Sequence, residues 1–231
     1  MNVSVNEIAD SSLPTHRVAE PAILYFGTPV VLIGTTNEDG SYNLSPMSSA
    51  WWLGDRCMLG LDRSSKTTEN MLRTRECVLN LPSAAMVAAV DRIARTTGSN
   101  PVPPAKAWRG YRSEKDKFGT AGLTPLKGEL VGAPRVAECP VNLEAKVEGV
   151  HQMAQDNPTI RGHLVAIEVS IARVHLDERM MMDGEANRID PDKWMPLIMS
   201  FQQFYALAPG KLQRSELGQI SEETYRVPKR G

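Results

Sequence analysis

Period-two alternation of apolar and polar residues is the feature that most constrains the fold of this chain. Every second position from Val141 to Val147 is apolar, and the same alternation recurs from about His163 to Leu176. Successive side chains of a strand point to opposite faces, so this pattern predicts long strands with one buried face. The chain is therefore expected to build its core around β-sheet.

Shorter apolar runs predict further strands. Thr28–Thr36 and Tyr42 to about Leu53 flank Asp39-Gly40, a hairpin signal because glycine adopts positive φ without steric penalty. A third strand through Cys57–Leu61 would complete an antiparallel meander. Strands joined by short turns, with two or three helices between them, predict a mainly β protein: a β-barrel with peripheral helices.

Two helices are predicted between the strands. The first spans Ser64 to Arg75 and has Ser64 or Ser65 as its N-cap. Cys77–Leu81 then forms a buried strand, and Ser83 caps a second, alanine-rich helix over Ala84–Arg95. Asn100–Ala105 holds three prolines in four positions and is predicted to be a loop.

Composition places the chain among ordinary globular proteins. Its 231 residues are 42% hydrophobic and 23% charged, which excludes a disordered chain and fits one large domain or two small ones. We predict a flexible arm over residues 1–20, a domain over 21–208 and a polar tail over 209–231. The net charge of −1 gives no general attraction to nucleic acid or anionic membranes, so neither is expected as a partner.

Cysteine usage and the N-terminal residues favour a cytoplasmic protein. MNVSVNEIAD lacks the basic and apolar regions of a signal peptide, and no window approaches the ~18 apolar residues of a membrane span. Cys57, Cys77 and Cys139 are odd in number, widely spaced and set among apolar neighbours. They are predicted to be buried, reduced thiols.

Familiar catalytic motifs do not occur. The four histidines have no metal-ligand spacing, so no metal site is expected. The chain also lacks G-x-S-x-G, Walker A and G-x-G-x-x-G sequences, which leaves a hydrolase or a Rossmann dehydrogenase unsupported.

Two hydroxyl-rich segments remain as candidate sites. Asp62–Asn70 combines a helix start with four hydroxyl groups, an arginine and a lysine, which suits a phosphate, although a solvated capped helix explains it too. Asn43–Trp52 places small polar residues within a strand. This suits a planar heterocycle lying against the backbone, or equally an edge strand with solvent-facing serines.

Taken together, these segments resemble the flavin reductase-like family of FMN-binding split-barrel proteins. The resemblance rests on six motifs in order: NLSPMSSAWW, CMLGLDRSSKTTENM, ECVLNLPS, EKDKFGTAGLTP with APRVAECPVNLEAKV, HLVAIEVSIARVHLDERM and DPDKWMPLIMSFQQFYAL. It covers about residues 22–208. Ala145 stands where the family commonly has cysteine, so no role is assigned to that position.

The resemblance implies a Greek-key split β-barrel that forms a homodimer and binds FMN. Residues implied to face the isoalloxazine ring are Ser45, Pro46, Met47, Ser48, Ser49 and Ala50. The phosphate and ribityl chain would be held by the segment comprising Asp62, Arg63, Ser64, Ser65, Lys66, Thr67 and Thr68. Asn80, Leu81, Pro82 and Ser83 would border the pocket. Trp51 and Trp52 would shield the flavin, or serve as ordinary core or interface aromatics.

The activity implied is that of an FMN-dependent oxidoreductase. Hydride would pass from NAD(P)H to flavin N5, with the cofactor carrying the chemistry and no side chain assigned as catalytic. A partner monooxygenase would receive reduced flavin if the cofactor is released. Two alternatives stay open: a non-catalytic flavin-binding or electron-carrier module, and an enzyme like pyridoxamine-phosphate oxidase from a related split-barrel class.

Overall fold

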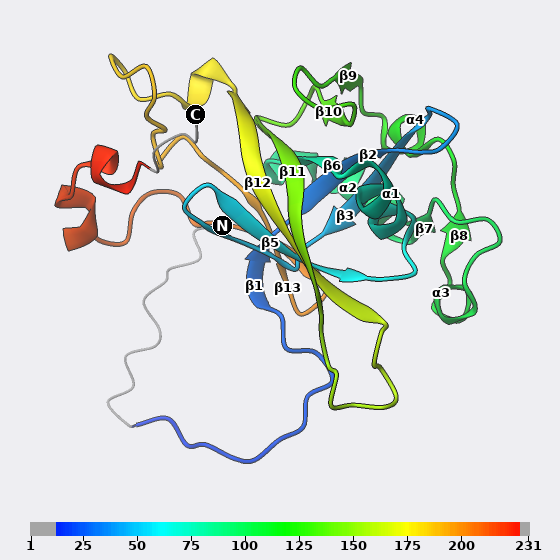
Figure 1. Ribbon diagram of the computed structural model, residues 1–231. Coiled ribbons are helices and arrows are strands. Elements are labelled where there is room, and N and C mark those ends of the chain that lie inside the picture. The colour runs from blue at the N-terminus through cyan, green and yellow to red at the C-terminus, as the bar shows by residue number, and fades with distance from the viewer. Residues whose placement is uncertain (1–12, 227–231) are drawn as a thin grey trace.

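The computed structural model describes residues 13–226 and has a strongly curled antiparallel sheet at its centre (Figure 1). The strands are β1 (Phe26–Pro29), β2 (Val31–Thr36), β3 (Tyr42–Met47), β4 (Ala50–Leu53), β5 (Arg56–Asp62), β6 (Glu76–Leu81), β7 (Thr96–Thr97), β8 (Arg112–Ser113), β9 (Pro125–Lys127), β10 (Pro134–Val136), β11 (Val141–Gln152), β12 (Leu164–Leu176), β13 (Leu197–Ser200) and β14 (Gln203–Ala206). The helices are α1 (Lys66–Thr74), α2 (Val87–Ala94), α3 (Pro104–Trp108) and α4 (Lys117–Ala121), with 3-10 turns η1 (Ala84–Met86), η2 (Glu178–Met180), η3 (Glu216–Gln219) and η4 (Glu222–Tyr225).

Seven strands form the central sheet in the order β3-β2-β6-β11-β12-β5-β4. The two edge strands, β3 and β4, are joined by Ser48 and Ser49 alone. So short a link requires the two edges of the sheet to lie side by side, and the sheet must therefore curl into a barrel. Because β3 and β4 do not pair with each other, the barrel is split along this seam.

The inside of the barrel is the main hydrophobic core. Inward-facing residues such as Ile33, Leu59, Leu79 and Ile167 are fully buried there, as the period-two pattern predicts. Met71 of α1 belongs to the same cluster, so this helix packs against the barrel interior with its buried face. The predicted mainly β, split-barrel fold is confirmed.

A second core lies outside the barrel. Helices α2 and α4 pack against the outer face of β2 and β3, where Leu32 and Leu44 are fully buried. The β9–β10 hairpin crosses β2 and β6. At Gly34 a Cβ atom would lie 2.2 Å from the carbonyl oxygen of Pro134, so only glycine allows the hairpin to approach this closely.

The predicted meander is right in its two pairings but wrong in its single second strand. β2 and β3 do pair, and β4 pairs with β5, but β3 and β5 lie near opposite edges of the sheet. β5 instead pairs with β12, whose residues lie about a hundred positions further along the chain. The predicted strand over Tyr42–Leu53 is accordingly two strands, broken at the seam.

Local breaks account for the other differences from prediction. The strand predicted over Thr28–Thr36 divides into β1 and β2, because β1 leaves the barrel to pair with β13. The helix predicted from Ala84 begins as a 3-10 turn, and Ser83 makes no side-chain cap to it. Pro104 and Ala105 open α3 rather than ending a loop, since proline is tolerated in a first helical turn.

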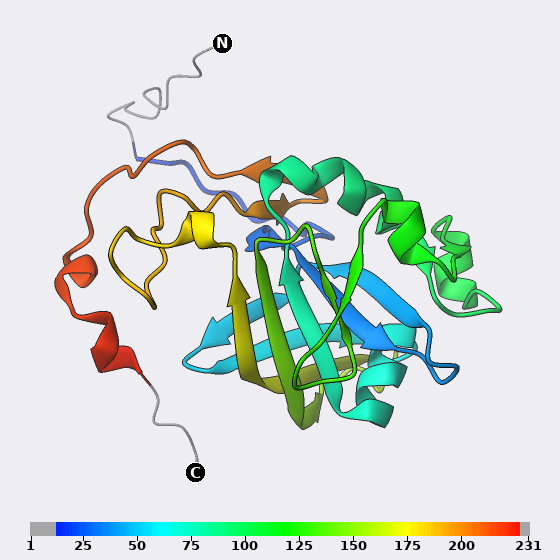
Figure 2. The same cartoon turned by 90° about the horizontal axis from the view of Figure 1, so that it is seen from above.

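The terminal segments stay apart from the core. Residues 13–20 hold no helix or strand and are exposed, whereas residues 1–12 of the predicted arm lie outside the described part. The tail runs away from the barrel, as Figure 2 shows, and forms η3 and η4 with every residue over 209–226 exposed. Within residues 13–226 no helix is long and apolar enough to cross a membrane.

Candidate functional site

The start of α1 is a preorganised donor surface. Ser65 is the N-cap, and its hydroxyl accepts the Thr68 N–H at 3.1 Å, as predicted for one of the two serines. Asp62 Oδ1 accepts from both the N–H and the hydroxyl of Ser64, at 2.8 and 2.7 Å. The backbone N–H groups of Lys66 and Thr67 have no partner within residues 13–226 and remain available to an anion.

The side chains of this segment divide into two groups. Arg63 and Ser64 are exposed, and Lys66 is half-buried with its Nζ 2.6 Å from Glu69 Oε1. Thr67 and Thr68 are buried, and their hydroxyls already bond within the protein. Direct phosphate contacts are therefore better suited to the first group than to the two threonines.

A buried polar cluster joins the two candidate segments. Asn43 of β3 donates through Nδ2 to Thr35 and to Thr67, each at 3.1 Å, so the strand of one segment is tied to the helix of the other. Asn43 Oδ1 is buried without a hydrogen-bond partner. A Cβ atom on Gly98 would lie 2.8 Å from this oxygen and 3.0 Å from Lys66 Cγ, so the chain after β7 closes tightly over both.

The predicted ring-facing residues lie at the seam of the barrel. Ser45 to Ser49 are half-buried and Ala50 is buried, which is neither a fully exposed edge nor a packed core. The carbonyl oxygen of Ser49 accepts the Gly60 N–H at 2.8 Å. The Ser49 hydroxyl lies 3.3 Å from the Tyr25 hydroxyl. β5 then runs from this contact to Asp62, linking the seam to the start of α1.

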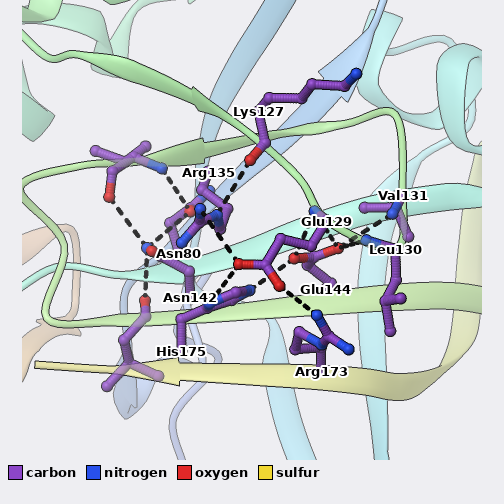
Figure 3. Close-up of polar contacts among 12 residues, drawn as sticks. Asn80, Lys127, Glu129, Leu130, Val131, Arg135, Asn142, Glu144, Arg173 and His175 are labelled. Carbon is purple, nitrogen blue, oxygen red and sulfur yellow. Dashed lines mark hydrogen bonds and ion pairs between the residues drawn. The ribbon is translucent and has the colours of Figure 1, made fainter.

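Asn80 and Ser83 have other surroundings. Asn80 is buried beneath the β9–β10 hairpin and donates to the carbonyl oxygen of Leu32 at 2.9 Å. Its Oδ1 accepts from Val136 N and Asn142 Nδ2 (Figure 3). Its amide atoms therefore have little left to offer a ligand. Ser83 is half-buried and forms a β-bridge with Pro196.

Lys117 is a further candidate residue, which lies in the motif EKDKFGTAGLTP and has no role predicted from the sequence. Its side chain, on α4, is only 2% exposed and has no ion pair or hydrogen bond within residues 13–226. Burial lowers the pKa of Lys117 from 10.5 to about 8, and repulsion by Lys106 acts in the same direction. α4 buries Lys117 together with Phe118 and Ala121. The signal available in the sequence was therefore a lysine beside the apolar positions of a short helix.

Lys106 connects Lys117 with α1. Burial lowers the pKa of this half-buried lysine, while the nearby Asp62 carboxylate opposes that shift. Lys106 and Lys117 thus lie within electrostatic range of each other, and Lys106 within range of the turn that begins α1. A buried ammonium group without a counter-ion is costly unless an anion is bound.

A separate cluster fixes the β9–β10 hairpin. The buried Glu144 carboxylate accepts the backbone N–H groups of Glu129, Leu130 and Val131 at 2.6–3.1 Å, and His175 Nε2 lies 2.6 Å from its Oε1 (Figure 3). These bonds lower the pKa of Glu144, although burial alone would raise it. The cluster uses its charges internally, which indicates a structural role.

Metal ligation finds no support in the described residues, since no three His, Cys, Asp or Glu side chains between residues 13 and 226 gather as ligands. The donors and acceptor around α1 do suit a phosphorylated polyol. Free N–H groups and cations match a phosphate, and the unpartnered oxygen of Asn43 matches a hydroxyl donor.

Comparison with known proteins places this split barrel in a family. The family model described as "Flavin reductase like domain" matches residues 23–207, so the chain belongs to the flavin reductase-like family. It is 38% identical over 206 residues to the uncharacterized protein YdfE of Bacillus subtilis, covering 87% of this chain and 96% of that one.

Solved structures share the fold. Flavoredoxin of Desulfovibrio vulgaris (Miyazaki F) has a TM-score of 0.69 at 23% identity, covering 88% of this chain and all of that one. An FMN-binding protein from Thermus thermophilus, solved with bound 1-cyclohex-2-enone, has a TM-score of 0.64 at 14% identity, covering 87% and 100%. The chain is thus a flavin-related redox protein by family.

Proposed function

We propose that the protein is an FMN-dependent oxidoreductase that takes hydride from NAD(P)H. The observation that carries this proposal is a donor set made of the free N–H groups of α1, Lys66 and the unpartnered Lys117. Such a donor set suits a terminal phosphate, which FMN has and riboflavin lacks. FMN would supply the hydride-accepting chemistry, so no catalytic side chain is required.

The chain's own residues would bind and orient the cofactor. Lys66, Lys117 and the N–H groups of α1 would hold the phosphate, and Asn43 Oδ1 would accept from a ribityl hydroxyl. The half-buried stretch Ser45–Ser49 would lie against the isoalloxazine ring and exclude water from one face. Thr68 and Asp62 would keep the α1 turn in shape, through the bonds described above.

Anaerobic reduction tests the proposed activity. We expect the purified protein to carry a yellow chromophore, and we expect NADH or NADPH to bleach it. A bound flavin that neither nicotinamide bleaches, but that dithionite reduces, would contradict the oxidoreductase and favour the electron-carrier alternative. Conversion of pyridoxamine phosphate to pyridoxal phosphate would favour the other alternative.

Cofactor preference gives a second measurement. We expect FMN to bind at least about tenfold more tightly than riboflavin, because each charge-assisted hydrogen bond contributes roughly 1.5–3 kcal/mol. Titration of flavin fluorescence with apoprotein measures both dissociation constants. Equal constants would mean that the phosphate makes no contact with the protein.

Exposed apolar side chains on β4 support a homodimer. Trp51 is 56% exposed and Leu53 73% exposed on β4, and they line a shallow, mainly apolar cavity of about 210 Å³ with Met58 of β5. Large exposed apolar side chains of this kind are typical of interfaces. We expect light scattering to give about twice the monomer mass of 25.4 kDa.

Substitution locates the dimer interface. Leu53→Glu should shift the protein towards monomer at micromolar concentration, because a carboxylate would be buried against an apolar face. Leu212→Glu is the matched control, since Leu212 is also exposed but lies in the tail. A wild-type monomer, or a dimer unaffected by Leu53→Glu, would contradict this interface.

The cellular setting is also part of the proposal. Three free, buried thiols support a reducing compartment such as the cytoplasm, and burial raises the pKa of the Cys57 thiol to about 12. A monooxygenase that accepts reduced flavin stays a predicted partner, and nucleic acid is not expected as one.

A further inference from the structure

A basic stretch without acidic residues borders the proposed cofactor site. Residues 92–113 contain five arginines and lysines and no aspartate or glutamate, in a chain whose net charge is −1. Arg92 and Arg112 donate to backbone carbonyl oxygens. The side chains of Arg95, Lys106 and Arg109 form neither an ion pair nor a hydrogen bond with any part of residues 13–226. These three cations are therefore available to a ligand.

An exposed aromatic residue lies close in sequence to two of these cations. Trp108, the last residue of α3, is 88% exposed, and Lys106 and Arg109 flank it in sequence. A tryptophan offers a flat face on which a nucleobase can stack, and adjacent cations strengthen such a site for a nucleotide. A short helix with an exposed indole, and with two unpaired cations within two residues of it in sequence, suits a ligand that has both a base and phosphates.

The basic stretch over residues 92–113 meets the proposed cofactor site at Gly98. Gly98 lies against Asn43 and Lys66, and the Asp62 carboxylate attracts Lys106. α3 itself stands at the edge of the molecule beyond β7 and β8 (Figure 1). A ligand could therefore reach from α3 to the start of α1 without entering the barrel.

We propose that Lys106, Trp108 and Arg109 bind an adenosine diphosphate group, with the adenine stacked on Trp108 and the phosphates paired with the two cations. This inference rests on the proposed function, because the chain has no glycine-rich dinucleotide motif and the adenosine half of a donor needs another site. The group would belong to the reduced nicotinamide dinucleotide or to FAD.

Direct binding tests the site without any redox reaction. Calorimetric titration of the FMN-loaded protein with ADP should show saturable binding. Trp108→Ala, and Lys106→Ala with Arg109→Ala, should each weaken it about tenfold, as expected for losing one stacked base or a phosphate-binding pair. Lys211→Ala is the matched control, because Lys211 is an exposed cation in the tail. Wild-type binding of ADP by both α3 variants would overturn the proposal.

Two further measurements identify which molecule carries the adenosine diphosphate group. If it is the nicotinamide dinucleotide, both α3 variants should raise its KM about tenfold and leave the KM of reduced nicotinamide mononucleotide unchanged. If it is FAD, they should weaken FAD binding about tenfold, with FMN binding unchanged. Equal effects on the mononucleotide and dinucleotide would overturn the assignment to adenosine diphosphate. If no nicotinamide reduces the protein, the proposed function is wrong. The ADP and FAD titrations would still test the proposed adenosine diphosphate site on α3.

Discussion

Glu144→Gln should lower the free energy of unfolding by about 3–5 kcal/mol, because it removes a buried charge whose partners stay behind. Three backbone N–H groups and His175 converge on this carboxylate, as Figure 3 shows. An amide cannot satisfy them all, since its NH₂ group would face other donors. Urea denaturation at pH 7 measures the difference.

A nearby glutamate provides the control for Glu144. Glu138 also accepts a backbone N–H, that of Thr124 at 3.0–3.1 Å, but Glu138 is exposed. Glu138→Gln should therefore cost about 1 kcal/mol or less. If the two variants lost equal stability, burial would not be what makes the Glu144 cluster strong.

The Glu144 cluster should also impose a pH dependence. Its pKa in the folded protein is below the ordinary value, because the hydrogen bonds outweigh the opposing effect of burial. The unfolded chain therefore takes up a proton first, at about pH 4.3, and the stabilisation present above that pH is lost as the pH falls further. The difference in stability between wild type and Glu144→Gln should shrink below about pH 4. A difference independent of pH would contradict the charged cluster.

Lys117→Met should have opposite effects on stability and on cofactor binding. The pKa of Lys117 is lowered from 10.5 to about 8 by burial, which corresponds to a cost of about 3 kcal/mol for keeping the ammonium charged. Methionine removes that cost and fills similar space, so the apoprotein should become more stable. FMN affinity should fall about 100-fold, because the proposed site loses the buried cation that would pair with the phosphate.

Lys115→Met is the control for this prediction. Lys115 lies two residues away and its side chain is 79% exposed, with an ion pair to Asp39 at 2.9 Å. Its loss should change FMN affinity by less than about twofold and stability by less than about 1 kcal/mol. Weaker FMN binding in both variants would point to general electrostatic attraction instead of a specific contact.

The titration of Lys117 gives this proposal a pH signature. Between about pH 8 and 10.4 the unfolded chain binds a proton that the folded apoprotein has released, so the stability of the apoprotein should rise with pH in that range. FMN affinity should fall as the pH rises through about 8, because the bound phosphate needs the charged amine. Lys117→Met should show neither trend.

Sequence alone determined the elements whose evidence is local. The alternation over Val141–Val147 predicts β11, and serine before a polar helix start predicts the cap of α1, because both depend on residues within a few positions of each other. The ordered motifs also identified the family, which the matching family model confirms over residues 23–207.

Tertiary structure decided which elements lie side by side. The seven-stranded order sets β5 against β12 instead of β3, and no turn signal near Cys57 carries that information, since β-pairing is chosen by the whole sheet. For the same reason the sequence placed Asn43 in a candidate segment without singling it out, and it gave Lys117 no role. Their importance comes from an unpartnered amine and an unpartnered oxygen, and a buried group is unpartnered only in relation to neighbours distant in the chain.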